Sequence, residues 1–311
     1  MKKLSIISPI YNEADNIEKL FEKLLEVEKK ISSQFNLSTN IILINDGSTD
    51  NTSLLLEKKI LENNKFRLVN LSKNFGQQAA IFAGLSEFES DLYVTIDSDL
   101  QQDPEYILVM LKTFFSTKCQ IVQMKKKYLN YESKIKSFFS KIFYKLFLKF
   151  TNIDIHQGSS DFYLIDKIVR DKIINSSISS HFLRGFIHWT GYSKVFIEYE
   201  PEKRQEGLSK YNFLKQLEFA LTGLYFYSSK IPIYIFLLSV FIMVLCLVYF
   251  LYILAEYFVF GTPTPGWSST IIIILIFGAI NIFFNSIIIF LIFKIFNYLG
   301  RKPIYIKKDN K

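Results

Sequence analysis

The chain has little cysteine, little histidine and neither of the common glycine-rich phosphate motifs, and each absence excludes a class of protein. The two cysteines, Cys119 and Cys246, are too few and too far apart for a disulfide framework. The three histidines form no HExxH motif, and no Cys and His residues have the spacing of a zinc site. GxGxxG and GxxxxGKS/T are also absent, which disfavours a dinucleotide dehydrogenase and a P-loop nucleotidase.

Apolar and basic residues, in contrast, are abundant. Half of the 311 residues are apolar, 31 are Phe and only 21% are charged, which excludes a disordered chain and is unusual for a purely soluble one. The net charge of +8 predicts an anionic partner, which could be a nucleic acid, a phosphorylated substrate or a lipid surface. Composition alone does not choose among these three.

Two long apolar runs lie in the C-terminal part of the chain. Ile233–Ala255 and Thr270–Phe293 carry no charge, and each is long enough to cross a hydrocarbon core as a helix. Buried globular helices are the alternative, which two such runs in succession disfavour. Lys and Arg are absent from the connector Glu256–Ser269 but recur in residues 194–230 and 294–311. The positive-inside rule therefore predicts cytoplasmic flanks and an external connector.

The expected organisation follows from these runs. Residues 1–230, which begin without a signal peptide, form a cytoplasmic domain. Residues 231–296 form a two-helix transmembrane hairpin, and residues 297–311 form a basic cytoplasmic tail. Asn281 and Asn285 lie four residues apart in the second run, where amides join helices by hydrogen bonds, so a homo-oligomer is expected.

The first 130 residues alternate short β-rich runs with helical patterns. The expected strands are Leu4–Ser8, Ile41–Ile44, Leu68–Leu71, Leu92–Ile96 and Gln120–Met124. An apolar stripe from Ile17 to Leu25 predicts a first helix, and Asp103-Pro104 predicts the N-cap and first residue of another. Nearly continuous apolar strands separated by helices are typical of an α/β fold with a mainly parallel sheet and flanking helices.

Polar clusters follow three of these strands. They are Tyr11-Asn12-Glu13, Asn45-Asp46-Gly47-Ser48 and Asp97-Ser98-Asp99. Ligands of open parallel sheets bind beyond the carboxyl ends of the strands, so these loops outline one site. Asp97 and Asp99 leave a strand end one residue apart, and paired carboxylates with substrate phosphates are typical ligands of Mg²⁺ or Mn²⁺. A D-x-D sequence is also common in solvated turns and helix caps.

A lysine- and phenylalanine-rich stretch precedes the second part of the domain. In residues 133–150, Phe, Ile and Leu recur at helical spacing and lysines occupy another face. This pattern predicts an amphipathic helix at a membrane interface, followed by a juxtamembrane segment at 207–230. A core helix with a solvated lysine edge is the alternative. A nucleic-acid partner would explain neither the Phe face nor the apolar runs, so none is expected.

Six sequence blocks, in order, carry a family resemblance. They are SIISPIYNE, LINDGSTDNT, LSKNFGQQAAIFAGL, TIDSDLQQDPE and the later pair FLRGFIHWTGY and RQEGLSKY. Together they resemble family 2 glycosyltransferases with the GT-A fold, and specifically the polyisoprenyl-phosphate branch that includes dolichyl-phosphate mannose synthases and undecaprenyl-phosphate sugar transferases. The resemblance covers nearly the whole chain. It implies a donor that is a nucleotide-diphosphate sugar and an acceptor that is a polyisoprenyl phosphate lipid.

The resemblance also implies roles for individual residues. Asp97, Asp99 and Gln101 would hold Mg²⁺ or Mn²⁺ on the diphosphate, and Asp99, Asp161 and Arg204 are the candidate catalytic residues. The implied donor contacts are Pro9, Tyr11, Glu13, Asp46, Lys73, Gly76, Asp97 and Lys210. The implied acceptor-phosphate contacts are Lys126, Lys134 and Arg184. The chain departs from the family at Ser160 and Tyr163, where Gly and Arg are usual, and reads DLQQDPE instead of DLQDPPE.

The predicted function is an inverting, metal-dependent transfer of one sugar from a nucleotide-diphosphate sugar to a polyisoprenyl phosphate at the cytoplasmic face of the plasma (inner) membrane. The family resemblance implies that this lipid is undecaprenyl phosphate. Two alternatives stay open. One is a non-processive family 2 transferase that acts on a glycan or another lipid. The other is a catalytically inactive, membrane-anchored partner subunit. Such a scaffold would have no chemical need for four residues together: Asp97, Asp99, Asp161 and Arg204.

Overall fold

The computed structural model describes residues 2–127, 148–149, 151, 159–176 and 183–202, a set of residues between 241 and 295, and residues 304–308. The chain separates into two compact units. The first comprises Met1–Tyr227 together with Ile304–Lys311, and the second comprises Ser228–Pro303. The first unit is called the catalytic unit below, because it contains all the described candidate site residues.

In the described part of the catalytic unit, seven strands form one sheet in the order β3-β2-β1-β4-β6-β5-β7. The strands are β1 (Lys3–Ile10), β2 (Ser38–Asn45), β3 (Phe66–Asn70), β4 (Leu92–Thr95), β5 (Ile121–Lys126), β6 (Ser159–Asp166) and β7 (Lys194–Tyr199). β6 runs antiparallel to both of its neighbours, β4 and β5, and the other pairings are parallel. The mainly parallel sheet expected from the sequence is confirmed.

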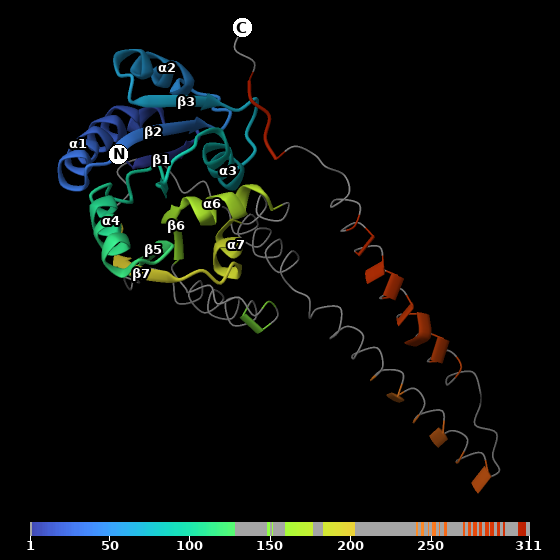
Figure 1. Cartoon of the computed structure of the whole chain (residues 1–311). Helices are drawn as coiled ribbons and strands as arrows, with labels where there is room; N and C mark the ends of the chain where they lie inside the picture. The colour runs from blue at the N-terminus through green and yellow to red at the C-terminus, as the bar shows by residue number, and fades with distance from the viewer. Residues whose placement is uncertain are drawn as a thin grey trace. The chain divides into compact units, whose positions relative to one another are not determined.

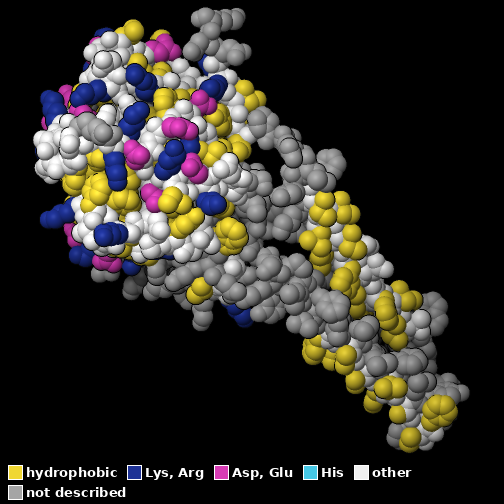
Figure 2. Space-filling model, viewed as in Figure 1, with side chains coloured by type: hydrophobic (Ala, Val, Ile, Leu, Met, Phe, Trp, Pro, Cys, Tyr) yellow, Lys and Arg dark blue, Asp and Glu magenta, His cyan; other side chains and the backbone are white. Residues whose placement is uncertain are grey.

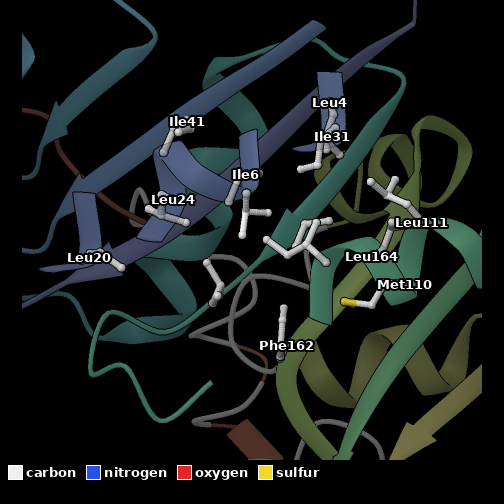
Figure 3. Packing of buried hydrophobic residues seen from close by; sticks show 14 of the residues in the cluster. Leu4, Ile6, Leu20, Leu24, Ile31, Ile41, Met110, Leu111, Phe162 and Leu164 are labelled. Carbon is white, nitrogen blue, oxygen red and sulfur yellow. The ribbon is translucent and has the colours of Figure 1, made fainter. Parts of the chain in front are cut away.

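Helices cover both faces of this sheet (Figure 1). The short 3-10 helix η1 (Ala14–Asn16) leads into α1 (Ile17–Phe35), which packs with α2 (Thr52–Glu62) and α4 (Tyr106–Thr117) on one face. The opposite face carries α3 (Gln77–Glu87), α6 (Lys167–Ile174) and α7 (Leu183–Trp189). The sheet therefore separates two apolar layers, one beneath each set of helices. Figure 3 shows the layer beneath α1 and α4, called the α1/α4 layer below.

The central strand β1 explains why both layers form. Its side chains alternate between faces, so Ile6 packs in the α1/α4 layer and Ile7 packs in the α3 layer, both fully buried. A strand buried on both faces reads as a continuous apolar run, as this one does. α3 approaches β1 closely at Gly84, where an added Cβ would lie 2.4 Å from Cγ2 of Ile7.

The five strands expected from the sequence are all present, with ends that differ by up to three residues. α4 begins at Tyr106, two residues after the predicted first residue, Pro104. The turn that precedes it is closed by backbone hydrogen bonds from residues 106–108 to the carbonyls three residues earlier, and the Asp103 carboxylate accepts the N–H of Glu105, which is the contact that an N-cap side chain makes. β6 and β7 were not among the expected strands.

The second unit is described only at separate residues, and each of these residues between 241 and 295 is helical. Large apolar side chains are exposed along it, including Phe258 and Ile274. Figure 2 shows hydrophobic side chains, in yellow, at the surface of this unit. Within the described residues, no helix combines the length and apolar character needed to cross a bilayer. Most of the two runs 233–255 and 270–293 lies outside the described residues. Asn285 donates to the side-chain oxygen of Asn281 in the same segment.

Residues 304–308, called the returning segment below, belong to the catalytic unit. Lys307 forms an antiparallel bridge with Leu71, directly after β3. The N–H of Ser72 donates to the carbonyl oxygen of Ile306, and the N–H of Lys308 donates to the carbonyl oxygen of Asn70, each over 2.8 Å. Part of the tail predicted as 297–311 is therefore a short extended piece paired at the edge of the sheet.

Candidate active site

The loops after β1 and β2 are joined by hydrogen bonds at the carboxyl edge of the sheet. The N–H of Asn12 donates to Oγ of Ser48 over 3.1 Å, and Oδ1 of Asn12 accepts from the N–H of Thr49 over 2.8 Å. The N–H of Glu13 donates to Oγ1 of Thr52 at the start of α2. The polar clusters that the sequence placed after two separate strands thus form one surface.

Asp46 anchors a third loop to that surface. Its carboxylate is 3% exposed and accepts the N–H of Phe75 over 2.8 Å and the N–H of Gly76 over 2.9 Å. Burial raises the pKa of Asp46, and the two N–H donors oppose this rise. Asp46 therefore holds the loop of residues 71–76 from inside. Its predicted contact with the donor nucleoside stays a prediction.

Gly47 permits this packing through its backbone. It has φ of +65°, and an added Cβ would lie 2.3 Å from the carbonyl carbon of Lys73. No side chain fits there without moving the loop. The loops after β2 and β3 are therefore in direct backbone contact at the site.

Asp97 leaves β4 with its carboxylate oriented by two glutamines. Nε2 of Gln77 donates to Oδ1, and Nε2 of Gln102 donates to Oδ2, each over 2.6 Å. Gln102 is buried, and its Oε1 accepts the N–H of Asp97 over 3.0 Å. Asp99, two residues on, accepts the N–H of Gln101 over 3.1 Å. Leu100, between them, adopts a left-handed backbone with φ of 58°, which turns the chain sharply at the site.

Asp161 enters the same edge from the antiparallel strand β6. Thr95 pairs with Tyr163 in the β4–β6 register, so continuing this register by two residues sets Asp97 opposite Asp161. Oγ1 of Thr95 donates to the backbone oxygen of Asp161. The Asp161 side chain is 5% exposed, and its Oδ2 accepts from Nε2 of Gln78 over 2.9 Å. The three acids of the sequence prediction thus come from two adjacent strands.

The donor set at this edge fits a hard divalent cation. Mg²⁺ and Mn²⁺ are typically bound through one or two carboxylates while substrate phosphates complete the shell. Gln77 and Gln102 each donate to one oxygen of Asp97 and so orient a carboxylate of the kind that such cations bind. Over the described ranges, no three His, Cys, Asp or Glu side chains gather as a protein-only metal site would require. The fit is therefore that of a site shared with a phosphorylated ligand.

The remaining candidates are distributed around this centre. Pro9 is buried in β1, while Tyr11 and Glu13 are half-buried in the loop that follows it. Lys73 is exposed, with its ammonium 5.2 Å from the centre of the Phe75 ring. Lys126 is half-buried at the end of β5. Arg184 lies in α7, but only its backbone is described. Lys134, Arg204, Lys210 and almost all of the predicted amphipathic helix lie outside the described residues.

Sequence reasoning missed the three glutamines that bind the acids: Gln77, Gln78 and Gln102. Gln102 stands inside the DLQQDPE block, where the departure from the family pattern was a signal. Gln77 and Gln78 follow Gly76 at a helix start, which the strand-and-helix pattern could have located at the site edge. What the sequence did not show was which acid each amide would reach.

Comparisons with known proteins agree with this geometry. The Glycosyl transferase family 2 profile matches residues 5–174. The uncharacterized glycosyltransferase sll0501 of Synechocystis sp. is 31% identical over 99% of this chain and 95% of its own length. The bactoprenol glucosyl transferase of Shigella phage SfV is 26% identical over 99% of both chains. The crystal structure of mannosyl-3-phosphoglycerate synthase from Rubrobacter xylanophilus superposes with a TM-score of 0.50 at 14% identity, over 72% of each chain, which supports the GT-A-like fold.

Proposed function

The chain belongs to glycosyl transferase family 2 and is a glycosyltransferase, and from this premise we propose that it transfers one sugar from a nucleotide-diphosphate sugar to a polyisoprenyl phosphate. The observation that carries the proposal is that Asp97, Asp99 and Asp161 lie at the same edge of the sheet, on two adjacent strands. Full-length similarity to proteins named bactoprenol glucosyl transferases supports the lipid acceptor. An undecaprenyl chain is the form we propose.

On the donor side, the reaction must stabilise a departing diphosphate whose negative charge grows in the transition state. Asp97 and Asp99 would hold a divalent cation, which when bound supplies Lewis-acid stabilisation of that charge. Gln77 and Gln102 fix the Asp97 carboxylate, so its orientation is set before the substrate arrives. The loop of residues 71–76, held by Asp46, lies at the same carboxyl edge of the sheet. These residues bind and orient the donor.

On the acceptor side, little base catalysis is needed. A phosphate monoester has a second pKa of about 6, so its attacking oxygen is already ionised near neutral pH. Asp161 then orients the acceptor, or a cation beside it, without removing a proton. A single in-line displacement at the anomeric carbon inverts its configuration. Arg204 and Lys210 remain proposed partners of the two phosphate groups.

We place the reaction at the cytoplasmic face of the plasma membrane. Exposed apolar side chains between residues 241 and 295 support contact with lipid, because soluble surfaces rarely carry so many together. The returning segment pairs with residues 70–72 of the catalytic unit, so both flanks of residues 228–303 lie on one side of any membrane that those residues cross. This supports an even number of crossings, as in a two-helix hairpin.

The test is a transfer assay with membranes that contain the full chain. Membranes are incubated with polyisoprenyl phosphate and each of a panel of radiolabelled nucleotide sugars, with and without a chelator. We expect label from one donor to enter the organic phase and the chelator to prevent it. Membranes with Asp99→Ala are the matched control and should give no label above background. Label that enters only a water-soluble glycan, or no label from any donor, would contradict the proposal.

A further inference from the structure

Two consecutive glutamines at the start of α3 bind the two acids on opposite sides of the proposed reaction. Gln77 donates to Oδ1 of Asp97 over 2.6 Å, and Gln78 donates to Oδ2 of Asp161 over 2.9 Å. Both glutamines are half-buried. One is bound to the proposed cation-binding acid, and the other to the proposed acceptor-side acid.

The helix that carries them is firmly held. Its N-cap residue, Gly76, donates its N–H to the buried carboxylate of Asp46. Residues 79–85 of α3 are buried in the core, and Gly84 lies against Ile7 of β1. Neighbouring residues of a helix point about 100° apart, so the two amides diverge from one fixed base toward two different strands.

The amide of Gln78 has a defined direction. Its Oε1 accepts the N–H of Leu183, the first residue of α7, over 3.1 Å. Because the oxygen is used there, the NH₂ group is the end that faces Asp161. Gln78 therefore has two separable contacts, one to the backbone of α7 and one to an acid in the site.

We propose that Gln77 and Gln78 are positioning residues that set the spacing between Asp97 and Asp161, and so between the donor and the acceptor. This inference rests on the proposed function, in which the two acids serve different substrates. Gln78 acts through Asp161, and Gln77 acts through Asp97. Loss of a residue that orients a ligating or reacting carboxylate typically costs about 10- to 100-fold in activity or metal affinity.

A double-mutant cycle tests Gln78. Gln78→Ala should lower kcat by about 10-fold or more and leave the donor KM within about twofold, since it acts through the acceptor-side acid. In an Asp161→Ala background, the same substitution should change kcat by less than about twofold, because the group through which it acts is gone. An equal loss in both backgrounds would overturn the proposal.

A second variant separates the two contacts of Gln78 and guards against loss of folding. Gln78→Glu keeps an oxygen to accept the N–H of Leu183 but has no NH₂ group for Asp161. We expect it to lose at least as much kcat as Gln78→Ala, whereas recovery to wild-type kcat would assign Gln78 a structural role only. Gln120→Ala is the matched control, because Gln120 also accepts a backbone N–H, that of Ser193, away from the site. It should leave kcat unchanged.

Gln77 has its own measurement. Gln77→Ala should raise the Mn²⁺ concentration that gives half-maximal activity by about 10-fold, while Gln78→Ala leaves it unchanged. An unchanged Mn²⁺ requirement in Gln77→Ala would overturn this half of the proposal. If wild-type protein does not label polyisoprenyl phosphate, the proposed function fails, and the same cycle is then measured on donor hydrolysis by water. If the losses caused by Gln78→Ala and Asp161→Ala are additive in this hydrolysis assay, the positioning role of Gln78 is overturned independently of the proposed function.

Discussion

The two halves of the sheet build the site in opposite ways. In the β1–β4 half, every strand is parallel and contributes the loop at its carboxyl end, as with Asn12, Asp46 and Asp97. In the β5–β7 half, the antiparallel strand β6 contributes Asp161 from near its amino end. Because β6 is reversed, its beginning lies at the edge where the parallel strands finish. Asp97, which follows a parallel strand, and Asp161, which lies near the start of the reversed strand, are therefore at the same edge of the sheet.

This difference suggests a division of labour. The parallel half holds Asp97 and Asp99 in the loop after β4, where Gln77 of α3 donates to Asp97 and the N–H of Gln101 donates to Asp99, and this suits a donor with a charged diphosphate. The reversed strand presents a single buried acid, which suits orientation of a second substrate. The following substitutions test whether the halves are as distinct as their construction implies.

The largest effect is expected for Asp99→Ala in the parallel half. Loss of a carboxylate that holds the cation on a departing diphosphate should lower turnover by on the order of 10³-fold or more. Transfer kinetics with saturating donor measure it. Asp103→Ala is the control, because Asp103 is a nearby acid whose carboxylate accepts the N–H of Glu105 at the start of α4. A similar collapse in both variants would show that the loop, and not the cation site, had been damaged.

A smaller loss is expected for Asp161→Asn in the reversed half. The amide keeps the size of the carboxylate, and the phosphate acceptor needs no base, so turnover should fall by about 10- to 100-fold and stay measurable. Single-turnover transfer to polyisoprenyl phosphate gives the rate. Complete inactivity, equal to that of Asp99→Ala, would contradict separate roles for the two halves.

Gly47→Ala should disturb the donor half without touching either acid. The new Cβ would lie 2.3 Å from the Lys73 carbonyl carbon, so the loop of residues 71–76 must move. We expect a loss of about 1–3 kcal/mol in the free energy of unfolding and a higher donor KM. Gly191→Ala is the matched control: its φ is +71°, similar to +65° at Gly47, but no atom lies within 4 Å of its added Cβ. If both variants raise the donor KM equally, backbone strain and not loop displacement is responsible.

The smallest effect is expected for Glu87→Gln, which removes the ion pair with Lys307 of the returning segment. The atoms are 2.9 Å apart, but Lys307 is largely exposed, so the loss should be below about 1 kcal/mol. Burial alone would raise the pKa of Glu87, but Lys307 and Tyr305 outweigh it, and the net pKa is lowered. The contribution is therefore present above the ordinary value of 4.5 and is lost as pH falls through the lower folded value.

Thermal unfolding at several pH values measures this last contribution. The difference between wild type and Glu87→Gln should be constant near neutral pH and shrink toward strong acid. Glu89→Gln is the control, since Glu89 is highly exposed and 3.9 Å from Lys167. A difference that grows as the solution becomes more acidic would contradict the assigned direction of the pKa shift.

The same contrast between the halves explains what the sequence could predict. β1 to β4 are apolar runs that end in polar loops, so their positions and their shared edge followed from local pattern alone. β6 contains an apolar run of four residues, Phe162–Ile165, like the run Ile41–Ile44 of β2, but its reversed direction and its place between β4 and β5 depend on a long-range pairing that no local pattern encodes. The family resemblance singled out Asp161, but its position opposite Asp97 required the register. The glutamine contacts depended on the packing of α3.

The returning segment also has a consequence for how the protein is made. Residues 304–308 complete the sheet edge beside residues 70–72, but the ribosome synthesises residues 228–303 first. A nascent or truncated chain that stops before Ile304 therefore leaves the backbone groups of Asn70 and Ser72 open to pairing with another chain. A fragment of the catalytic unit that omits residues 304–308 would leave this edge exposed, whereas one that retains them would cover it.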